Sequence, residues 1–459
     1  MTTTTLTLIL LLIMIAAFVL SSIKLKSPDI SMAVAAVVLA IAGTIAVPEL
    51  GSPVRYLVEG LFVNLDLALL FIAASIFVNI YSHSGAIAAI TRTVVEKVNN
   101  KWILLSIMGV LMLIPGALTG AGSVAIFVLG GLVNTVLEYL GITQRKRTVF
   151  ICFFAMLSAA CPPINLWTML MTAQANMPYV GFTWLLLIPI VIAGAFTIVF
   201  VGWGAKPQNK EETLAKFPPK DPKLTWWRIA LPFVAIIALF LLALYDPWGL
   251  PVLGLPLMFI IAAVVAFLCN PKKTTFKQYL GILDDTMEQV FPLVANVLSI
   301  GVLQSAMAAT GVRGLIGSTC VGLPLVLIYS LILFVGPMCQ GCFNYGVSIV
   351  LGGPLIFMFN TLGMDVTVIC AALSLIFPLG DTLPPSRIVG RLACETTGYK
   401  ESYISFFKTL ILPMLVLGIM AVIMIIHCVI LMIKSCRILM KIRAIVLMLL
   451  INLLLYVVS

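Results

Sequence analysis

Two ionisable residues flank a Pro-Pro pair in a very apolar part of the chain. Asp381 precedes Pro384 and Pro385, and Arg387 follows them. A charge at membrane depth is costly, so an ionisable residue there is a functional candidate. We expect Asp381 to lie near a coupling cation and Arg387 to face an anionic substrate, because a guanidinium binds carboxylates through paired N–H groups. The alternatives are an ion pair between the two residues and an Arg387 side chain that extends to the membrane surface.

Four interruptions of the apolar segments gather further polar residues. Two are the Pro-Pro pairs at 162–163 and 384–385, and two are the stretches 118–123 and 340–344. A proline leaves a carbonyl without its helical donor, and such a carbonyl can bind Na⁺. Helix N-termini at the breaks suit anions. A hydroxyl that hydrogen-bonds its own helix is the alternative for each Ser or Thr.

These breaks give two sets of candidates. The predicted coupling-cation (Na⁺) residues are Gly120, Ser123, Ser158, Asn344, Gly380, Asp381 and Thr382. The predicted substrate-binding residues are Thr119, Asn165, Thr168, Gln340, Ser386 and Arg387, and the helix breaks are Pro162, Pro163, Pro384 and Pro385.

The composition decides what kind of chain carries these residues. Of 459 residues, 62% are hydrophobic and only 10% are charged, whereas a soluble domain is roughly half apolar and a quarter charged. Apolar runs of roughly 17–25 residues, each long enough to span a bilayer, recur along the chain. We therefore predict an all-α polytopic membrane protein. The net charge of +10 lies in short loops, which indicates topology signals rather than nucleic-acid binding.

The chain is expected to contain the same order of elements twice. Residues 1–203 should hold three spans, a hairpin at 102–141, a broken helix at 147–175 and a plain span. After a polar linker at 204–227, the order recurs in 228–428, with a hairpin at 324–361 and a broken helix at 366–396. An extra apolar segment, 429–459, closes the chain, and whether its 438–458 part spans the membrane stays open.

The helix breakers recur at a constant offset of 222 residues (337 − 115). The matching pairs are Pro115/Pro337, Gly130/Gly352, Gly131/Gly353, Gly141/Gly363, Pro162/Pro384 and Pro163/Pro385. Chance apolar similarity would match Leu and Val, so this pattern indicates an internal duplication. Each half makes an odd number of net crossings, which predicts two inverted repeats, the signature of a secondary transporter. Basic loop residues place the 204–227 linker in the cytoplasm and the N-terminus outside.

The doubled segments also resemble a known family. At Gly116–Gly131, Leu140–Pro163 and Leu362–Pro385 the chain is similar to the large permease subunit of TRAP (tripartite ATP-independent periplasmic) transporters, in the ion transporter superfamily. The resemblance implies an elevator-type transporter in the bacterial inner membrane, with Na⁺ as the coupling ion and organic-anion substrates such as C4-dicarboxylates. It also implies a small membrane subunit and a periplasmic solute-binding protein as partners.

Other functions remain open at this point. A stand-alone carboxylate–cation symporter or a Na⁺/H⁺ antiporter of the same superfamily is the close alternative. A channel would need a continuous polar stripe, and we expect polar residues only at the four breaks. An intramembrane enzyme would depend on Cys339, Cys342 and Asp381, with no histidine at membrane depth to complete a site. We therefore expect no enzyme and no cofactor.

Overall fold

The computed structural model describes residues 3–25, 27–207, 210–218, 221–245, 254–271, 276–322, 325–384 and 387–428. Every regular element in these ranges is a helix. Three predicted features, Pro385, Ser386 and the segment 429–459, lie outside the described residues.

Seven helices of the described ranges are long and apolar enough to cross a membrane, which makes the chain a polytopic helical membrane protein. They are Thr4–Leu25, Pro53–His83, Lys101–Thr119, Gly122–Tyr139, Phe182–Gly202, Lys277–Ala309 and Tyr403–Cys428. Shorter apolar helices at Ile30–Ala46, Trp226–Leu239, Leu255–Cys269 and Val366–Thr382 accompany them.

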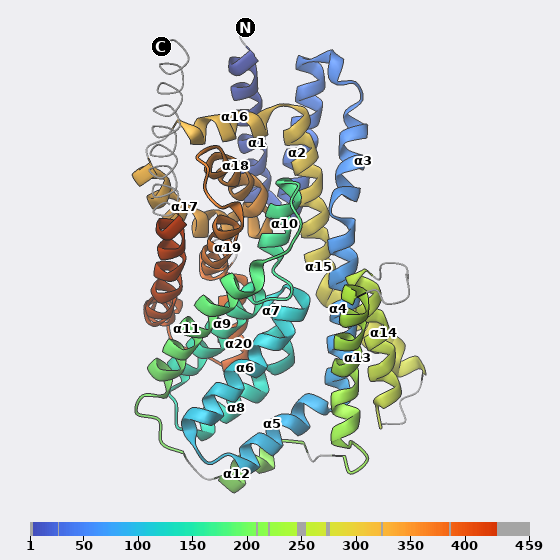
Figure 1. Ribbon diagram of the computed structural model, residues 1–459, viewed down its shortest axis with the longest axis vertical. Helices are drawn as coiled ribbons and strands as arrows, with labels where there is room; N and C mark the ends of the chain where they lie inside the picture. Colours follow the sequence, from blue (N-terminus) through green and yellow to red (C-terminus); the bar gives the residue numbers. More distant parts are fainter. Residues whose placement is uncertain are drawn as a thin grey trace, which may run out of the picture.

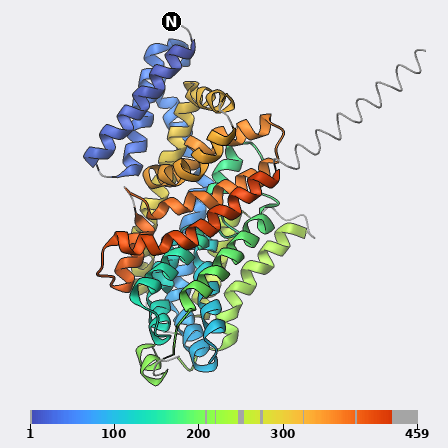
Figure 2. The same ribbon diagram turned by 90° about the vertical axis from the view of Figure 1, so that its left-hand side faces the viewer.

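The early helices frame one end of the molecule. In Figure 1, α1 (Thr3–Leu25) and α2 (Pro28–Ala46) lie at the end that carries the N-terminus. The short helices α5 (Ala86–Lys97) and α12 (Lys210–Lys216) lie at the opposite end. In Figure 2 the α1–α2 pair, in dark blue, lies at the edge of the molecule. The 3₁₀ turn η1 (Pro48–Leu50) connects α2 to α3 (Pro53–Val63), which is followed by α4 (Leu65–His83), and α11 (Phe182–Gly202) follows later in the chain.

The segments expected to form hairpins are interrupted helices, and each contains a π-helical turn. In the first, α6 (Lys101–Thr119) is followed by α7 (Gly122–Ala125), η2 (Ile126–Gly130) and α8 (Gly131–Tyr139). In the second, α17 (Leu325–Phe343) is followed by η3 (Asn344–Gly346), η4 (Ser348–Gly352) and α18 (Gly353–Thr361), with a bend of 115°. The π turns η2 and η4 end on the paired glycines Gly130 and Gly352. The local structure thus recurs at the same offset as the sequence.

The segments expected to form broken helices each contain two helical parts. The first consists of α9 (Gln144–Ala160) and α10 (Leu166–Gln174). The second consists of α19 (Val366–Ile376) with η5 (Phe377–Thr382), followed by α20 (Ile388–Thr397). The side chain of Asp365 begins α19 by accepting a hydrogen bond from the backbone N–H of Thr367 at 2.8 Å, as an N-cap residue does. Pro162 and Pro163 lie between the end of α9 and the start of α10.

The described helices pack into two separate apolar cores. The smaller core joins α1 and α2 to α15 (Phe276–Ala309) and α16 (Val312–Val321), and it also contains buried residues of α4, α10 and η4. The larger core holds both hairpins and both broken helices, together with α13 (Trp226–Tyr245) and α14 (Leu255–Cys269). In the smaller core α15 lies against α2 and α3. A Cβ on Gly60 of α3 would lie only 2.6 Å from the Cα of Val302, so the α3 and α15 backbones touch. Small residues permit such close helix contacts in membranes.

Candidate functional site

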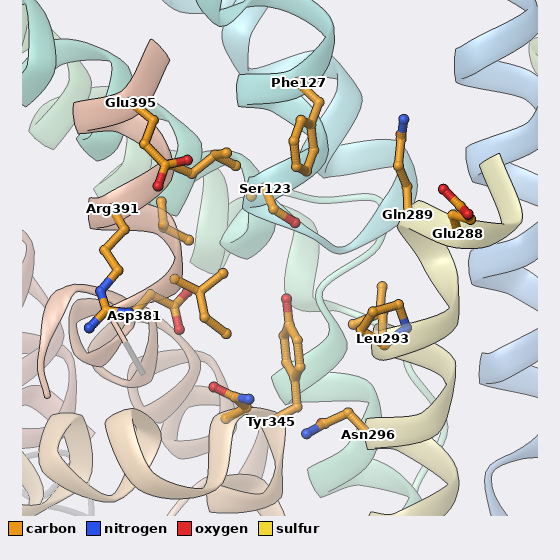
Figure 3. A pocket seen from close by; sticks show the side chains of 16 residues that line it. Ser123, Phe127, Glu288, Gln289, Leu293, Asn296, Tyr345, Asp381, Arg391 and Glu395 are labelled. Carbon is orange, nitrogen blue, oxygen red and sulfur yellow. The ribbon is translucent and has the colours of Figure 1, made fainter. Parts of the chain in front are cut away.

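A cavity of about 500 Å³ lies where elements of the two cores meet. The first hairpin, the second hairpin, the second broken helix, α15 and α20 all contribute to its wall (Figure 3). The polar and charged lining residues are Ser123, Glu288, Gln289, Asn296, Asn344, Tyr345, Asp381, Arg391 and Glu395. Apolar lining comes from Phe127, Leu293, Ile388, Val389 and Leu392, among others.

The floor of the cavity, formed by Asp381, Asn344 and Tyr345, is buried except for the partly exposed Tyr345. Asp381 retains 9% of its exposure and accepts a hydrogen bond from Nε2 of Gln340 at 2.7 Å. Oε1 of Gln340 in turn accepts from the indole N–H of Trp167 at 2.8 Å. Because an indole nitrogen can only donate, it fixes the orientation of the Gln340 amide and directs its N–H₂ group at Asp381. Trp167 of α10 is thus connected to Asp381 of η5 through the Gln340 side chain.

Tyr345 connects the two hairpins at this floor. Its hydroxyl donates to the carbonyl oxygen of Gly120 at 3.1 Å, and its ring lies 4.8 Å from that of Trp167, centroid to centroid. Figure 3 shows the Tyr345 side chain extending into the space between Asp381 and Leu293. The first hairpin tip, the second hairpin tip and the first broken helix therefore meet at one aromatic side chain.

The mouth of the cavity, formed by Glu288, Arg391 and Glu395, is exposed and charged. Arg391 and Glu395 lie on α20 at one wall, and Glu288 lies on α15 at the opposite wall (Figure 3). Within the described parts of the chain, no ion pair joins Arg391 to a carboxylate. The lining therefore holds one guanidinium, from Arg391, and three carboxyl groups, from Glu288, Glu395 and Asp381. Among the described residues none of these groups forms an ion pair with another.

The predicted residues divide into those on the cavity and those beside it. Ser123, Asn344 and Asp381, all predicted to bind the coupling cation, line the same cavity. Gln340 lies directly behind Asp381. A Cβ on Gly380 would lie 2.5 Å from the Cβ of Gln340, so this glycine allows the close packing of α17 against η5. The cation-binding role of these residues remains a prediction.

Arg387 lies in a different place from the one expected. Its backbone is left-handed, with φ of 48°, and its guanidinium lies 5.0 Å above the ring of Tyr403. It does not line the cavity, and no ion pair between it and Asp381 occurs in the described ranges. The arginine on the cavity is Arg391, one helical turn further along α20.

Three of the predicted Ser and Thr hydroxyls donate to backbone carbonyls three or four residues earlier in the chain, which is the alternative to a ligand-binding role. The three such contacts are Thr119 Oγ1 to Pro115 O, Ser158 Oγ to Ala155 O and Thr382 Oγ1 to Leu379 O, at 2.8, 2.7 and 3.2 Å. Asn165 caps α10 by accepting from the Thr168 N–H at 3.0 Å and donates to Ser374 Oγ at 3.1 Å. Thr168 Oγ1 is buried and has no hydrogen-bond partner in the structure.

The helix α15 contributes polar lining that was not predicted from the sequence. Glu288, Gln289 and Asn296 all lie on this spanning helix and outside the four breaks, so the expectation that polar residues occur only at the breaks is wrong. The available signal was the spacing of Asp285, Gln289 and Asn296, which is four and then seven residues and places them on one helical face. Arg391 and Glu395 of α20 show the same four-residue spacing.

A second, smaller polar cavity adjoins the first. It has a volume of about 220 Å³ between α4 and α15, and Gln289 lines both cavities. Asn79 of α4 donates to Thr286 Oγ1 at 3.0 Å and to Gln289 Oε1 at 3.4 Å. The side chains of Asn79 and Gln289 therefore separate two polar spaces within the membrane-spanning part of the molecule.

No cluster of three or more His, Cys, Asp or Glu residues in the described ranges has the arrangement to hold a metal ion. The floor of the cavity carries the Asp381 carboxyl group and the Asn344 amide.

The fold is similar to that of two solved membrane transporters. The YdaH transporter of Alcanivorax borkumensis matches with a TM-score of 0.54 and 13% identity, over 82% of this chain and 88% of that chain. MtrF of Neisseria gonorrhoeae, described among a class of antimetabolite efflux pumps, matches with a TM-score of 0.56 and 11% identity, over 83% of this chain and 84% of that chain. No protein-family model and no curated protein sequence matches the chain. At such low identity the likeness shows the fold and assigns no residue a role.

Proposed function

We propose that the chain is a secondary transporter that couples Na⁺ movement to the transport of a small organic carboxylate across a bacterial inner membrane. One observation carries the proposal: a buried acid, two hairpin tips and an unpaired arginine meet around a single cavity. Its similarity to two transporters of known structure supports the general class.

Asp381 is the proposed cation ligand. A carboxylate that is 9% exposed at membrane depth needs a compensating charge, and its one side-chain partner in the described ranges is a neutral amide. A Na⁺ ion between Asp381, Asn344 and the carbonyls of the hairpin tips would supply that charge. Cation binding would thereby lower the free energy of the state in which the tips are closed around the floor.

Arg391 is the proposed partner of the substrate carboxylate. It takes the role that the sequence suggested for Arg387, because it lines the cavity and has no ion pair of its own there. Its exposed position at the mouth leaves both guanidinium edges free for a bidentate contact, which Lys could not make.

Two inverted repeats and an elevator mechanism are part of the proposal. The recurrence of the π turns and the broken helices at the sequence offset supports the duplication. The separate apolar cores support a movement of one body against another. In this scheme α15, held against α3 at Gly60 and Gly301, is the stationary wall of the cavity.

Two assemblies would use this cavity. The chain could be the large subunit of a TRAP system, with a small membrane subunit and a solute-binding protein, or it could be a stand-alone carrier. The efflux description of MtrF makes export a second possible direction of transport.

Uptake into proteoliposomes tests the proposal. Labelled succinate and a panel of other carboxylates are offered to the purified chain, with and without an inward Na⁺ gradient, and then with the small subunit and binding protein of a TRAP system added. We expect Na⁺-driven uptake that Asp381→Asn abolishes. Asp66→Asn removes an acid from the exposed surface of α4 and is the matched control, which should retain uptake. Carboxylate uptake that is equal with and without Na⁺ would refute the coupling.

A further inference from the structure

The charges at the mouth of the cavity do not suit a simple anion. Arg391 is its one basic lining residue in the described ranges, and Glu288 and Glu395 accompany it. If Na⁺ neutralises Asp381, two glutamates still face one arginine. A dicarboxylate bound to Arg391 would then lie close to two further negative charges, and like charges at such distances repel each other.

We infer that the substrate carries an ammonium group together with its carboxylate, as an amino acid does. The inference rests on the proposed function and narrows its substrate class. Arg391 binds the carboxylate, and Glu288 and Glu395 bind the ammonium group. With Na⁺ at Asp381, the site holds two positive charges, from Na⁺ and Arg391, and three negative charges, from Asp381, Glu288 and Glu395. A neutral zwitterion leaves this net charge of −1 unchanged, whereas a dicarboxylate would add two further negative charges.

The positions of these residues support a ligand with two separated charges. Arg391 and Glu395 are one helical turn apart on α20, and Glu288 lies across the cavity on α15 (Figure 3). None of the three has an ion-pair partner among the residues described. A ligand that bridges the two walls can therefore reach a base on one side and an acid on the other without breaking a protein contact.

The remaining lining residues suit an apolar side chain. Phe127, Leu293, Ile388 and Leu392 also line the cavity. A volume of about 500 Å³ is within the usual range for small-molecule sites and leaves room for an amino acid with a branched or aromatic side chain.

The test uses pairs of compounds that differ only in the amino group. Phenylalanine is compared with 3-phenylpropionate and phenethylamine, leucine with 4-methylpentanoate, and glutamate with glutarate, each with the purified full chain in Na⁺. Binding is measured as the ligand-induced rise in unfolding temperature, and transport as uptake into proteoliposomes. We expect at least one amino acid to bind at least about tenfold more tightly than its analogue without the amino group, because that analogue leaves the two glutamates without a partner.

Variants at the mouth of the cavity test whether Glu288 and Glu395 cause the preference for a ligand with an amino group. In Glu288→Gln/Glu395→Gln the preference for the amino acid should fall to less than about threefold, whereas Asp284→Asn, which changes an acid on the same helix α15 away from the cavity, should keep it. Carboxylates that bind as well without the amino group, or an amine that binds as well without the carboxylate, would overturn the inference. Na⁺-driven uptake of glutarate but not glutamate would overturn it and leave the proposed function intact. The absence of any Na⁺-driven carboxylate uptake would refute both.

Discussion

Replacing Trp167 with phenylalanine tests the hydrogen-bond chain behind the acid. The phenyl ring keeps the contact with Tyr345 but removes the indole N–H that holds Gln340. Gln340 is 1% exposed and Trp167 is 0% exposed, so water cannot replace the lost donor. A buried acceptor without a partner costs about 1–3 kcal/mol, and we expect the free energy of unfolding to fall by that amount.

The loss of the indole N–H donor should also weaken Na⁺ binding in the proposed site. Without the indole donor the Gln340 amide can rotate and present its oxygen to Asp381, which places an acceptor where a donor was. We expect the Na⁺ concentration for half-maximal transport to rise in Trp167→Phe. Gln340→Leu should destabilise the protein further, because it removes the neutral donor that contacts the Asp381 carboxylate and leaves the indole N–H buried without an acceptor.

A double-mutant cycle supplies the decisive measurement. Reversible unfolding in mixed micelles, followed by far-ultraviolet circular dichroism, gives the free energies of the wild type, both single variants and Trp167→Phe/Gln340→Leu. Because removing both partners leaves neither of them unpaired, the double variant should be more stable than the sum of the single effects predicts, by about 0.5–3 kcal/mol. Effects that add to within about 0.5 kcal/mol would show that the two side chains do not act together.

Two further pairs of variants test the packing of the first hairpin and the roles of the two arginines. Gly122→Ala would bring a Cβ against the backbone carbonyl of Ala155, 3.0 Å from its carbon atom, and should lower the free energy of unfolding by about 1–3 kcal/mol. Gly131 has open space around it and a helical φ of −64°, so Gly131→Ala should raise the free energy of unfolding by about 0.4–1 kcal/mol. Equal effects of the two variants would contradict the close packing at Gly122. Arg391→Lys should raise the concentration of substrate for half-maximal uptake because Lys lacks the bidentate fork, whereas Arg387→Lys should leave it unchanged; a larger effect at Arg387 would return that residue to the substrate.

The breaks could be predicted because their chemistry is local. A Pro-Pro pair cannot continue a helix, and Gly120 adopts a φ of 71° that favours glycine. These signals are independent of the rest of the fold, and the structure interrupts its helices at residues 120–121 and 161–165, where these residues occur. Asp381, Asn344 and Ser123 lie together because they belong to these breaks.

The other side of the cavity could not be predicted in the same way. The left-handed backbone at Arg387 turns its side chain to Tyr403, and α20 then brings Arg391 to the mouth one turn later. Nothing in the adjacent residues specifies that turn. The direction of Glu288 depends on how α15 packs on α3 at Gly60, a contact between segments far apart in the chain.

Tyr403 offers a way to observe the site without altering it. Its hydroxyl donates to the carbonyl of Thr382 at 2.7 Å, next to Asp381, while its ring lies under Arg387. Tyr403 itself begins the helix Tyr403–Cys428 and is not a cavity residue. A fluorine atom on that ring would therefore give a nuclear magnetic resonance signal that follows movements of the second break. A change in this resonance on addition of Na⁺ would therefore test ion binding at Asp381 while every residue that lines the cavity stays unchanged.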